Sequence, residues 1–129
     1  EVTELRARAA LAAARASSGA ERDRLVAFAE QQIEKIGKEG SGWTNAVTTL
    51  RRASAREIRG DKDGAIRELR SAIAACDEAQ LGAHAAAARM RLGALLDGEE
   101  GTALRETALS FLMTEEVKKP EAFVALYAP

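Results

Sequence analysis

Glycine-containing turns recur along the chain about every 40 residues, and this period constrains the fold more than any other feature. Gly19, Gly60 and Gly98 each separate two stretches of helical character, and they lie 41 and 38 residues apart. The breaks at 37–42 and 80–82 alternate with them at a similar spacing. A period of this length, built from two antiparallel helices, is typical of helical-repeat proteins. The sequence therefore predicts one domain of three helix pairs, over about 1–40, 41–80 and 81–117.

Apolar residues within each predicted helix recur at helical spacing, and none of the segments alternates with the period of a strand. Ala, which has the highest intrinsic helix propensity, accounts for 29 of the 129 residues. Large apolar side chains are scarce, so the helices must approach closely with Ala as the spacer. The expected fold class is all-α.

Residues 60–73 carry the sharpest local pattern. Gly60 is expected to end a helix, Ala65 and Ala72 to allow close helix approach, and Leu69 to fill the space between them. This pattern resembles the second half of a tetratricopeptide (TPR) repeat. The preceding helix departs from that repeat, because arginines stand where Leu and an aromatic residue are usual. The prediction is a divergent, TPR-like superhelix of about three antiparallel helix pairs.

A short C-terminal capping helix is expected over 120–129. Pro120 suits its first turn. Phe123 and Tyr127 are four residues apart and are expected to fold back over the exposed face of the last pair. Helical-repeat arrays need such a cap at their ends.

Charge and composition exclude several classes of function. With 19 basic and 20 acidic side chains the net charge is −1, which argues against nucleic acid binding driven by bulk charge. No apolar run approaches the length of a membrane span. The single Cys76 cannot form an internal disulfide, which favours a reducing, cytoplasmic compartment. The chain starts at Glu1 without an initiator Met, so we expect it to be a piece of a longer protein.

No residue pattern in the chain predicts catalysis, a metal site or a cofactor. Cys76 lies on an apolar stripe and is interpreted as a buried small residue rather than a reactive thiol. His84 is the sole histidine and is expected to have a structural role near a helix start. The paired acidic residues near Gly60 and Gly98 are expected to cap helix N-termini. They are Asp61, Asp63, Glu99 and Glu100.

The densest basic cluster lies in the third predicted helix. Arg52, Arg56 and Arg59 fall on one side of that helix, opposite Trp43, which is interpreted as a packing residue between helices. Two interpretations stay open for these arginines: a solvated face, or a charged strip that receives an acidic partner segment. The candidate partner-binding residues are Arg51, Arg52, Arg56, Arg59, Arg89 and Arg91.

The chain from residue 42 onward also resembles a more specific class of sequence. The segments that carry the resemblance are HAAAAR (84–89), RLG (91–93), GEEG (98–101), VKKP (117–120) and LYAP (126–129). They are similar to the C-terminal helical-repeat tails of large bacterial, eukaryotic-like serine/threonine protein kinases. None of the kinase catalytic motifs is present, so the resemblance implies that phosphoryl transfer belongs to another part of the parent protein.

The leading hypothesis is a non-catalytic regulatory domain that binds a protein or peptide segment. In TPR-type arrays the first helix of each pair lines the concave binding face, and the arginines would orient an acidic segment there. One alternative is the helical sensor segment of a large ATP-dependent transcription regulator. Another is a structural dimerisation module, which would self-associate.

Overall fold

A computed structural model describes residues 2–115 and 120–129. These residues form seven α-helices and no strand. The all-α prediction is confirmed. The predicted end of the third pair at 117 and the segment 117–119 lie outside the described residues. The helices are α1 (Val2–Arg15), α2 (Gly19–Gly37), α3 (Gly42–Ile58), α4 (Lys62–Glu78), α5 (Gly82–Leu95), α6 (Gly98–Thr114) and α7 (Pro120–Tyr127).

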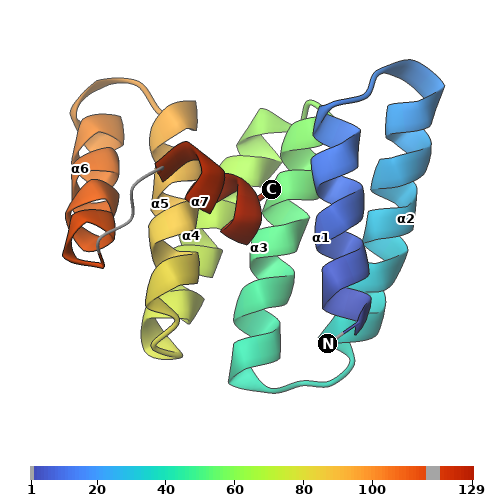
Figure 1. The fold of residues 1–129 in the computed structure, drawn as a ribbon, viewed down its shortest axis with the longest axis horizontal. Coiled ribbons are helices and arrows are strands. Elements are labelled where there is room, and N and C mark those ends of the chain that lie inside the picture. Colours follow the sequence, from blue (N-terminus) through green and yellow to red (C-terminus); the bar gives the residue numbers. More distant parts are fainter. Residues whose placement is uncertain (1, 116–119) are drawn as a thin grey trace.

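The first six helices form three consecutive antiparallel pairs, α1 with α2, α3 with α4 and α5 with α6 (Figure 1). Successive pairs contact each other through α2 with α3 and α4 with α5. Each pair lies within the residue range that the glycine spacing predicts. The fold is therefore the predicted helical-repeat array of three pairs followed by a short helix.

The turns within the pairs depend on residues with positive φ. Gly60 has a φ of 86°, and its N–H donates to the Glu57 carbonyl at 2.9 Å. The N–H of Asp61 donates to the Arg56 carbonyl at 2.9 Å, which completes a Schellman motif at the end of α3. The Asp61 carboxylate then accepts a hydrogen bond from the Gly64 N–H at 2.9 Å, so the predicted cap of α4 is confirmed.

Ser18 and Glu21 have the spacing of a capping box, which predicts a helix start at Ser18, and this prediction holds only for the helix boundary. Ser18 occupies the N-cap position, as the spacing of Ser18 and Glu21 predicts. Its side chain makes no capping hydrogen bond, however. Ser41, before α3, does accept a hydrogen bond from the Thr44 N–H at 3.1 Å.

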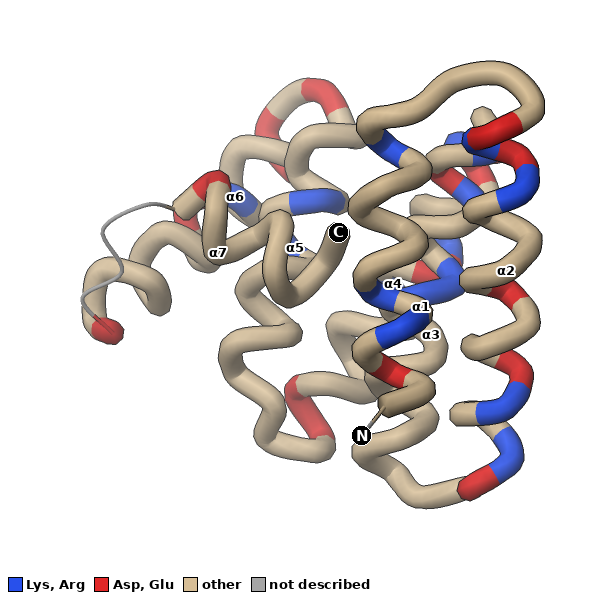
Figure 2. The backbone as a smooth tube through the Cα atoms, turned by 45° about the vertical axis from the view of Figure 1, so that its right-hand side comes forward, with Lys and Arg blue, Asp and Glu red and all other residues tan. Residues whose placement is uncertain are grey.

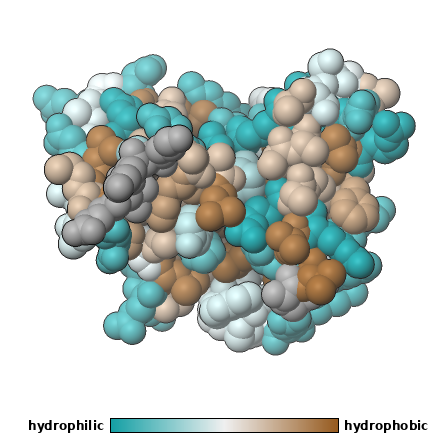
Figure 3. Space-filling model, viewed as in Figure 1, coloured by the Kyte–Doolittle hydropathy of each residue, from teal (hydrophilic) through white to brown (hydrophobic). Residues whose placement is uncertain are grey.

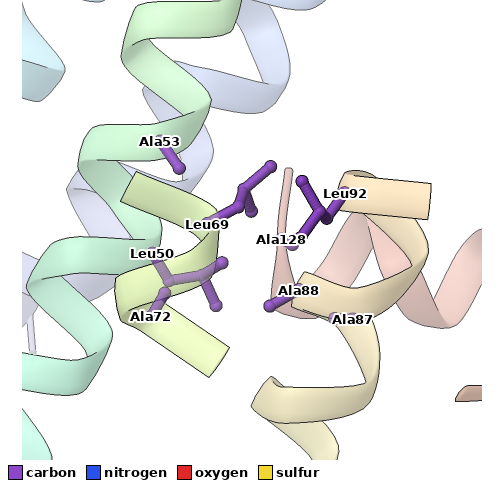
Figure 4. Close-up of a cluster of buried hydrophobic side chains, with 8 residues drawn as sticks. All are labelled: Leu50, Ala53, Leu69, Ala72, Ala87, Ala88, Leu92 and Ala128. Atoms are coloured by element: carbon purple, nitrogen blue, oxygen red, sulfur yellow. The ribbon is translucent and has the colours of Figure 1, made fainter. Parts of the chain in front are cut away.

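The central core lies between the middle and last pairs and is built largely from small residues (Figure 4). Leu69 and Leu92 are 1% exposed and point toward each other from α4 and α5. Ala side chains fill the space around them, as the composition predicts. The core consists of Leu50, Ala53, Leu69, Ala72, Ala87, Ala88, Leu92 and Ala128.

Helix α5 is buried on more than one side. Its four consecutive alanines, 85–88, are all buried, which a helix with a single buried stripe does not achieve. The reason is that α5 contacts α4, α6 and α7. Helix α7 turns back from the end of the array and lies across α5 toward α3 and α1 (Figure 1).

The predicted C-terminal cap is therefore confirmed, but it reaches further than the last pair. Phe123 packs against a buried cluster of Ala86, Ala108 and Leu112, from α5 and α6, as expected. Ala128, just after α7, has no exposed surface and belongs to the central core. The end of α7 thus closes the junction between the middle and last pairs.

Candidate partner-binding site

The structure separates the six candidate arginines into distinct surroundings. Arg51 on α3 and Arg91 on α5 face the end of α7. Arg52, Arg56 and Arg59 lie on the other side of α3, where they line a pocket with residues of α2 and the start of α4. Arg89 extends to Asp77 at the end of α4. The candidates do not form one continuous site.

Three arginines from three different helix pairs meet at the end of α7. Arg8 of α1 donates to the carbonyl of Leu126 at 3.4 Å, and Arg51 of α3 donates to that of Tyr127. Arg91 of α5 donates to the carbonyl of Ala128 at 2.7 Å. We call Arg8, Arg51 and Arg91 the arginine triad.

The chemistry of this contact follows from helix geometry. The last carbonyls of a helix have no partner within it, and they carry the negative end of the helix dipole. Three guanidinium groups supply both hydrogen-bond donors and positive charge at that point. Because α1, α3 and α5 are the first helices of the three pairs, we call the surface they form the first-helix face.

Arg51 is the most constrained member of the triad. Its side chain has no exposed surface, and its Nε and Nη2 atoms donate to Glu4 Oε1 at 3.0 and 2.6 Å. Burial lowers the pKa of Arg51 from its usual value, while the charge of Glu4 and its hydrogen bonds oppose that shift. A partner cannot touch Arg51 in this arrangement, because α7 covers it. Burial likewise lowers the pKa of Arg91.

Beside the triad, the first-helix face contains a pocket of about 190 Å³. The His84 ring contacts Tyr127 edge to face, with centroids 5.0 Å apart. Burial and the nearby Arg51 charge lower the pKa of His84. The expected position of His84 in the first turn of a helix is confirmed. The pocket is lined by Glu4, Arg8, Trp43, Val47, His84 and Tyr127.

The prediction for Trp43 is wrong. It was expected to pack between helices, but its side chain is 48% exposed at the rim of this pocket. Trp43 is the second residue of α3. It therefore lies at the N-terminal end of that helix, where neighbouring helices do not cover it. Figure 3 shows further hydrophobic surface on the same face, including a patch over the N-terminal part of α1, where Val2 and Leu5 are exposed.

The arginine strip Arg52, Arg56 and Arg59 lines a second pocket, of about 330 Å³, which also contains three carboxylates, Glu30, Glu34 and Asp61. Basic and acidic positions are interspersed along the α2 side of the molecule (Figure 2). The strip therefore offers little unbalanced charge.

Two of the strip arginines are already paired. Arg59 binds Glu30 through two hydrogen bonds of 2.9 and 2.7 Å, which raise the pKa of Arg59. Arg56 binds Asp61 at 3.0 Å. Arg52 forms no ion pair with any described residue. That the strip receives an acidic partner stays a prediction.

Arg89 is paired in the same way. Its guanidinium donates to both carboxylate oxygens of Asp77, at 3.2 and 2.6 Å. This ion pair joins α5 to α4 and does not involve α7. Arg89 therefore lies outside the triad, although it is only two residues before Arg91.

Cys76 is buried, as predicted. Burial, assisted by Asp77, raises the pKa of its thiol to about 11, so the thiolate is disfavoured at neutral pH. Within residues 2–115 and 120–129, no group of His, Cys, Asp and Glu side chains could hold a metal ion. No helix in those ranges is long and apolar enough to cross a membrane.

Sequence reasoning missed Arg8 and Glu4, two residues of the first-helix face. Both lie in the first predicted helix pair, over about 1–40, where no site residue was predicted. Their spacing of four residues would place them on the same side of α1, and Arg8 Nε lies 3.7 Å from Glu4. The run of alanines in α5 was a second unused signal, because burial on all sides requires an additional covering helix.

No protein-family model, curated protein or solved structure matches this chain. The class that the fold defines is thus the all-α helical-repeat array, and its function has to be argued from the site itself.

Proposed function

We propose that this chain is a non-catalytic protein-interaction domain that binds a peptide segment on its first-helix face. One observation carries the proposal. That face already holds a peptide segment, α7, through one arginine from each of the three helix pairs. A surface that binds one short helix in this way has the shape and the donors to bind another.

Binding on this face would combine apolar burial with directional hydrogen bonds. Trp43 gives it an exposed aromatic side chain, the residue type most enriched among the strongest contributors to protein interfaces. Arginine, also enriched there, is supplied by Arg8 and Arg91. The first-helix face thus contains the side chains expected of a partner-binding surface.

The parent protein is proposed from the sequence resemblance: a bacterial serine/threonine protein kinase, with this chain as its regulatory helical-repeat tail in the cytoplasm. The sensor segment of a transcription regulator remains the alternative. Sequencing the reading frame upstream of Glu1 separates the two, because one parent encodes a kinase domain there and the other a nucleotide-switch ATPase.

Capture of partners from an extract of the source bacterium tests the binding face. The immobilised chain is compared with two variants, Trp43→Ser and the control Phe28→Ser. Phe28 is also exposed, at 42%, but lies on the second helix of its pair. We expect Trp43→Ser to lose a partner that both the wild type and Phe28→Ser retain. Equal capture by all three proteins would contradict the proposed face.

The acidic character of the partner is tested separately with Arg52→Glu. Arg52 has no ion pair among the described residues, so this change breaks no salt bridge there, and circular dichroism checks that the variant is folded. If the strip receives an acidic segment, Arg52→Glu slows association at low salt and reduces its salt dependence. An unchanged association rate at both salt concentrations would show that the strip is a solvated face.

A further inference from the structure

The way α7 is held indicates what the first-helix face recognises. The arginine triad bonds to three consecutive backbone carbonyls, those of Leu126, Tyr127 and Ala128. Recognition of backbone atoms does not depend on the side chains of those residues. It requires a helix that ends at this point with its carbonyls free.

We propose that the arginine triad is a binding site for the C-terminal end of a helical peptide, which α7 occupies within the chain and a partner helix occupies after displacing it. This inference rests on the proposed function and names the class of partner. Binding of a partner is then a competition between two helices for one site.

Several features make α7 a replaceable occupant. It has only eight residues, and isolated helices of that length are marginal in water, so its helix depends on docking. Within α7 only Val124 is buried, and it still has 7% exposed surface, whereas Leu126 is 52% exposed. The bond from Arg8 to Leu126 is long, at 3.4 Å.

The contacts of α7 also define the partner. Phe123 and Tyr127 stack with their centroids 4.6 Å apart, and Phe123 reaches the cluster at α5 and α6. The next residue, Ala128, enters the central core and has no exposed surface, so a larger side chain there would have to displace its neighbours. The partner is therefore a helix with two aromatic residues four apart, a small residue after the second, and free carbonyls at its end.

A synthetic peptide tests the site on the full chain. The probe is a fluorescent peptide of residues 120–129 with an amidated C-terminus, and its affinity is measured by fluorescence anisotropy. In the chain itself, Phe123→Ala with Tyr127→Ala weakens the resident α7 but leaves the triad unchanged. We expect this double variant to bind the peptide at least tenfold more tightly than the wild type, because the internal competitor is lost.

Substitutions in the triad supply the specific readout. In the double-variant chain, Arg8→Met with Arg91→Met should reduce peptide affinity at least tenfold. Arg89→Met is the matched control, because Arg89 lies on the same helix as Arg91 but pairs with Asp77, and it should leave affinity unchanged. Circular dichroism confirms that each variant is folded. Arg51 is left intact because its burial makes it part of the fold.

Comparison of the amidated peptide with the free-acid peptide distinguishes two kinds of ligand, helix carbonyls and a carboxylate. If the triad recognises helix carbonyls, the amidated and free-acid peptides bind alike. Binding by the free acid alone would overturn the inference in favour of a carboxylate site. Absence of peptide binding to the folded double variant, or equal loss of affinity with Arg89→Met, would overturn it as well.

The experiments distinguish failure of the proposed partner-binding face from failure of the helix-end site. If extract partners depend on Trp43 but the peptide does not bind, the interaction function stands and the helix-end site is wrong. If the peptide binds through the triad but no partner depends on Trp43, the helix-end site stands and the proposed partner face is wrong.

Discussion

Arg51 shows how a single residue can join three segments that are distant in the sequence. It belongs to α3, it pairs with Glu4 of α1, and it donates to the carbonyl of Tyr127 in α7. Leaving a buried charge without its partner is costly, typically about 3–5 kcal/mol. Arg51 is therefore a structural residue first, and it could reach a partner only if α7 moved.

Replacing Glu4 by Ala tests that role. We expect the free energy of unfolding to fall by about 3 kcal/mol, because the buried guanidinium keeps only the Tyr127 carbonyl. The control is Glu100→Ala, which breaks the exposed pair of Arg70 and Glu100, whose side chains are 49% and 54% exposed. That change should cost much less, because water screens an exposed ion pair. Denaturant titration measures both, and equal losses would contradict the role of Arg51.

His84 makes stability depend on pH in a defined direction. Its pKa in the folded state lies below the usual 6.5, through burial and the charges of Arg51 and Arg8, with Glu4 opposing. The unfolded chain therefore binds a proton more readily than the folded chain. The contribution of neutral His84 is complete above about pH 6.5 and is lost as the pH falls toward the folded-state pKa.

His84→Phe isolates this effect. Phe keeps a ring against Tyr127 but does not titrate, so the fall in unfolding free energy between pH 7 and pH 5 should be smaller than in the wild type. Denaturant titrations at the two pH values measure it. An identical fall in both proteins would show that His84 does not contribute.

For single residues, features that follow from the local sequence were predicted well, and contacts between distant segments were predicted poorly. Capping by Asp61 involves a residue three positions away, and the burial of Cys76 could be predicted from its place on the apolar stripe of its own helix. Both predictions are confirmed. The exposure of Trp43 and the burial of Arg51 depend on where α7 and α1 lie. No pattern local to α3 contains that information.

Among the helices, the glycine period and the apolar spacing were enough to predict the three pairs. The turn after α4 was predicted at 80–82 and lies there, but the residue with positive φ is Gln80, at 59°, and not the glycine of that segment. Its N–H donates to the Asp77 carbonyl at 3.1 Å, and that of Leu81 donates to the Cys76 carbonyl at 2.8 Å. This is the Schellman geometry of Gly60 without glycine, so residue type alone does not reveal it.

The docking position of α7 was also beyond prediction from sequence. Its aromatic pair indicates that one side is buried, but a helix of eight residues fits several surfaces. The site is selected by donors on α1, α3 and α5, which are far apart in the sequence. The sequence therefore predicted that α7 contacts the last pair, but not that it also contacts α1 and α3.

Close contact of α5 and α6 at Gly101 leads to a prediction for these helices. A Cβ atom at Gly101 would clash with the Leu96 carbonyl oxygen and lie 3.0 Å from that of Gly93. Both are backbone atoms, so Gly101→Ala forces the helices apart and should cost about 2–3 kcal/mol. Gly42→Ala is the control, since a Cβ there meets nothing within 4 Å. Thermal unfolding compares the two, and equal melting temperatures would contradict the close contact.

For the whole molecule, α7 determines whether the junction between the middle and last pairs is closed. A chain that ends at Glu115 loses Val124 and Ala128 from the buried set and uncovers part of the central core. We expect stability to fall by about 3 kcal/mol, from lost apolar burial, and the melting temperature by roughly 10 °C.

Two measurements on the shortened chain check this. Calorimetry gives the melting temperature, and light scattering gives the mass in solution, which should rise if the uncovered surface self-associates. An unchanged melting temperature together with a monomeric mass would contradict the role of α7 as the cover of the central core.

Placing Ala128 in the central core also has a consequence for how the protein is made. Residues 120–129 leave the ribosome after the six helices that they join. Translation at about 5–20 residues per second delays them by roughly one second, during which the junction stays open. A newly made chain therefore exposes its arginine triad before it exposes any competitor for it. A partner that is present at synthesis could bind first, and later proteolytic removal of residues 120–129 from the array would restore that early state.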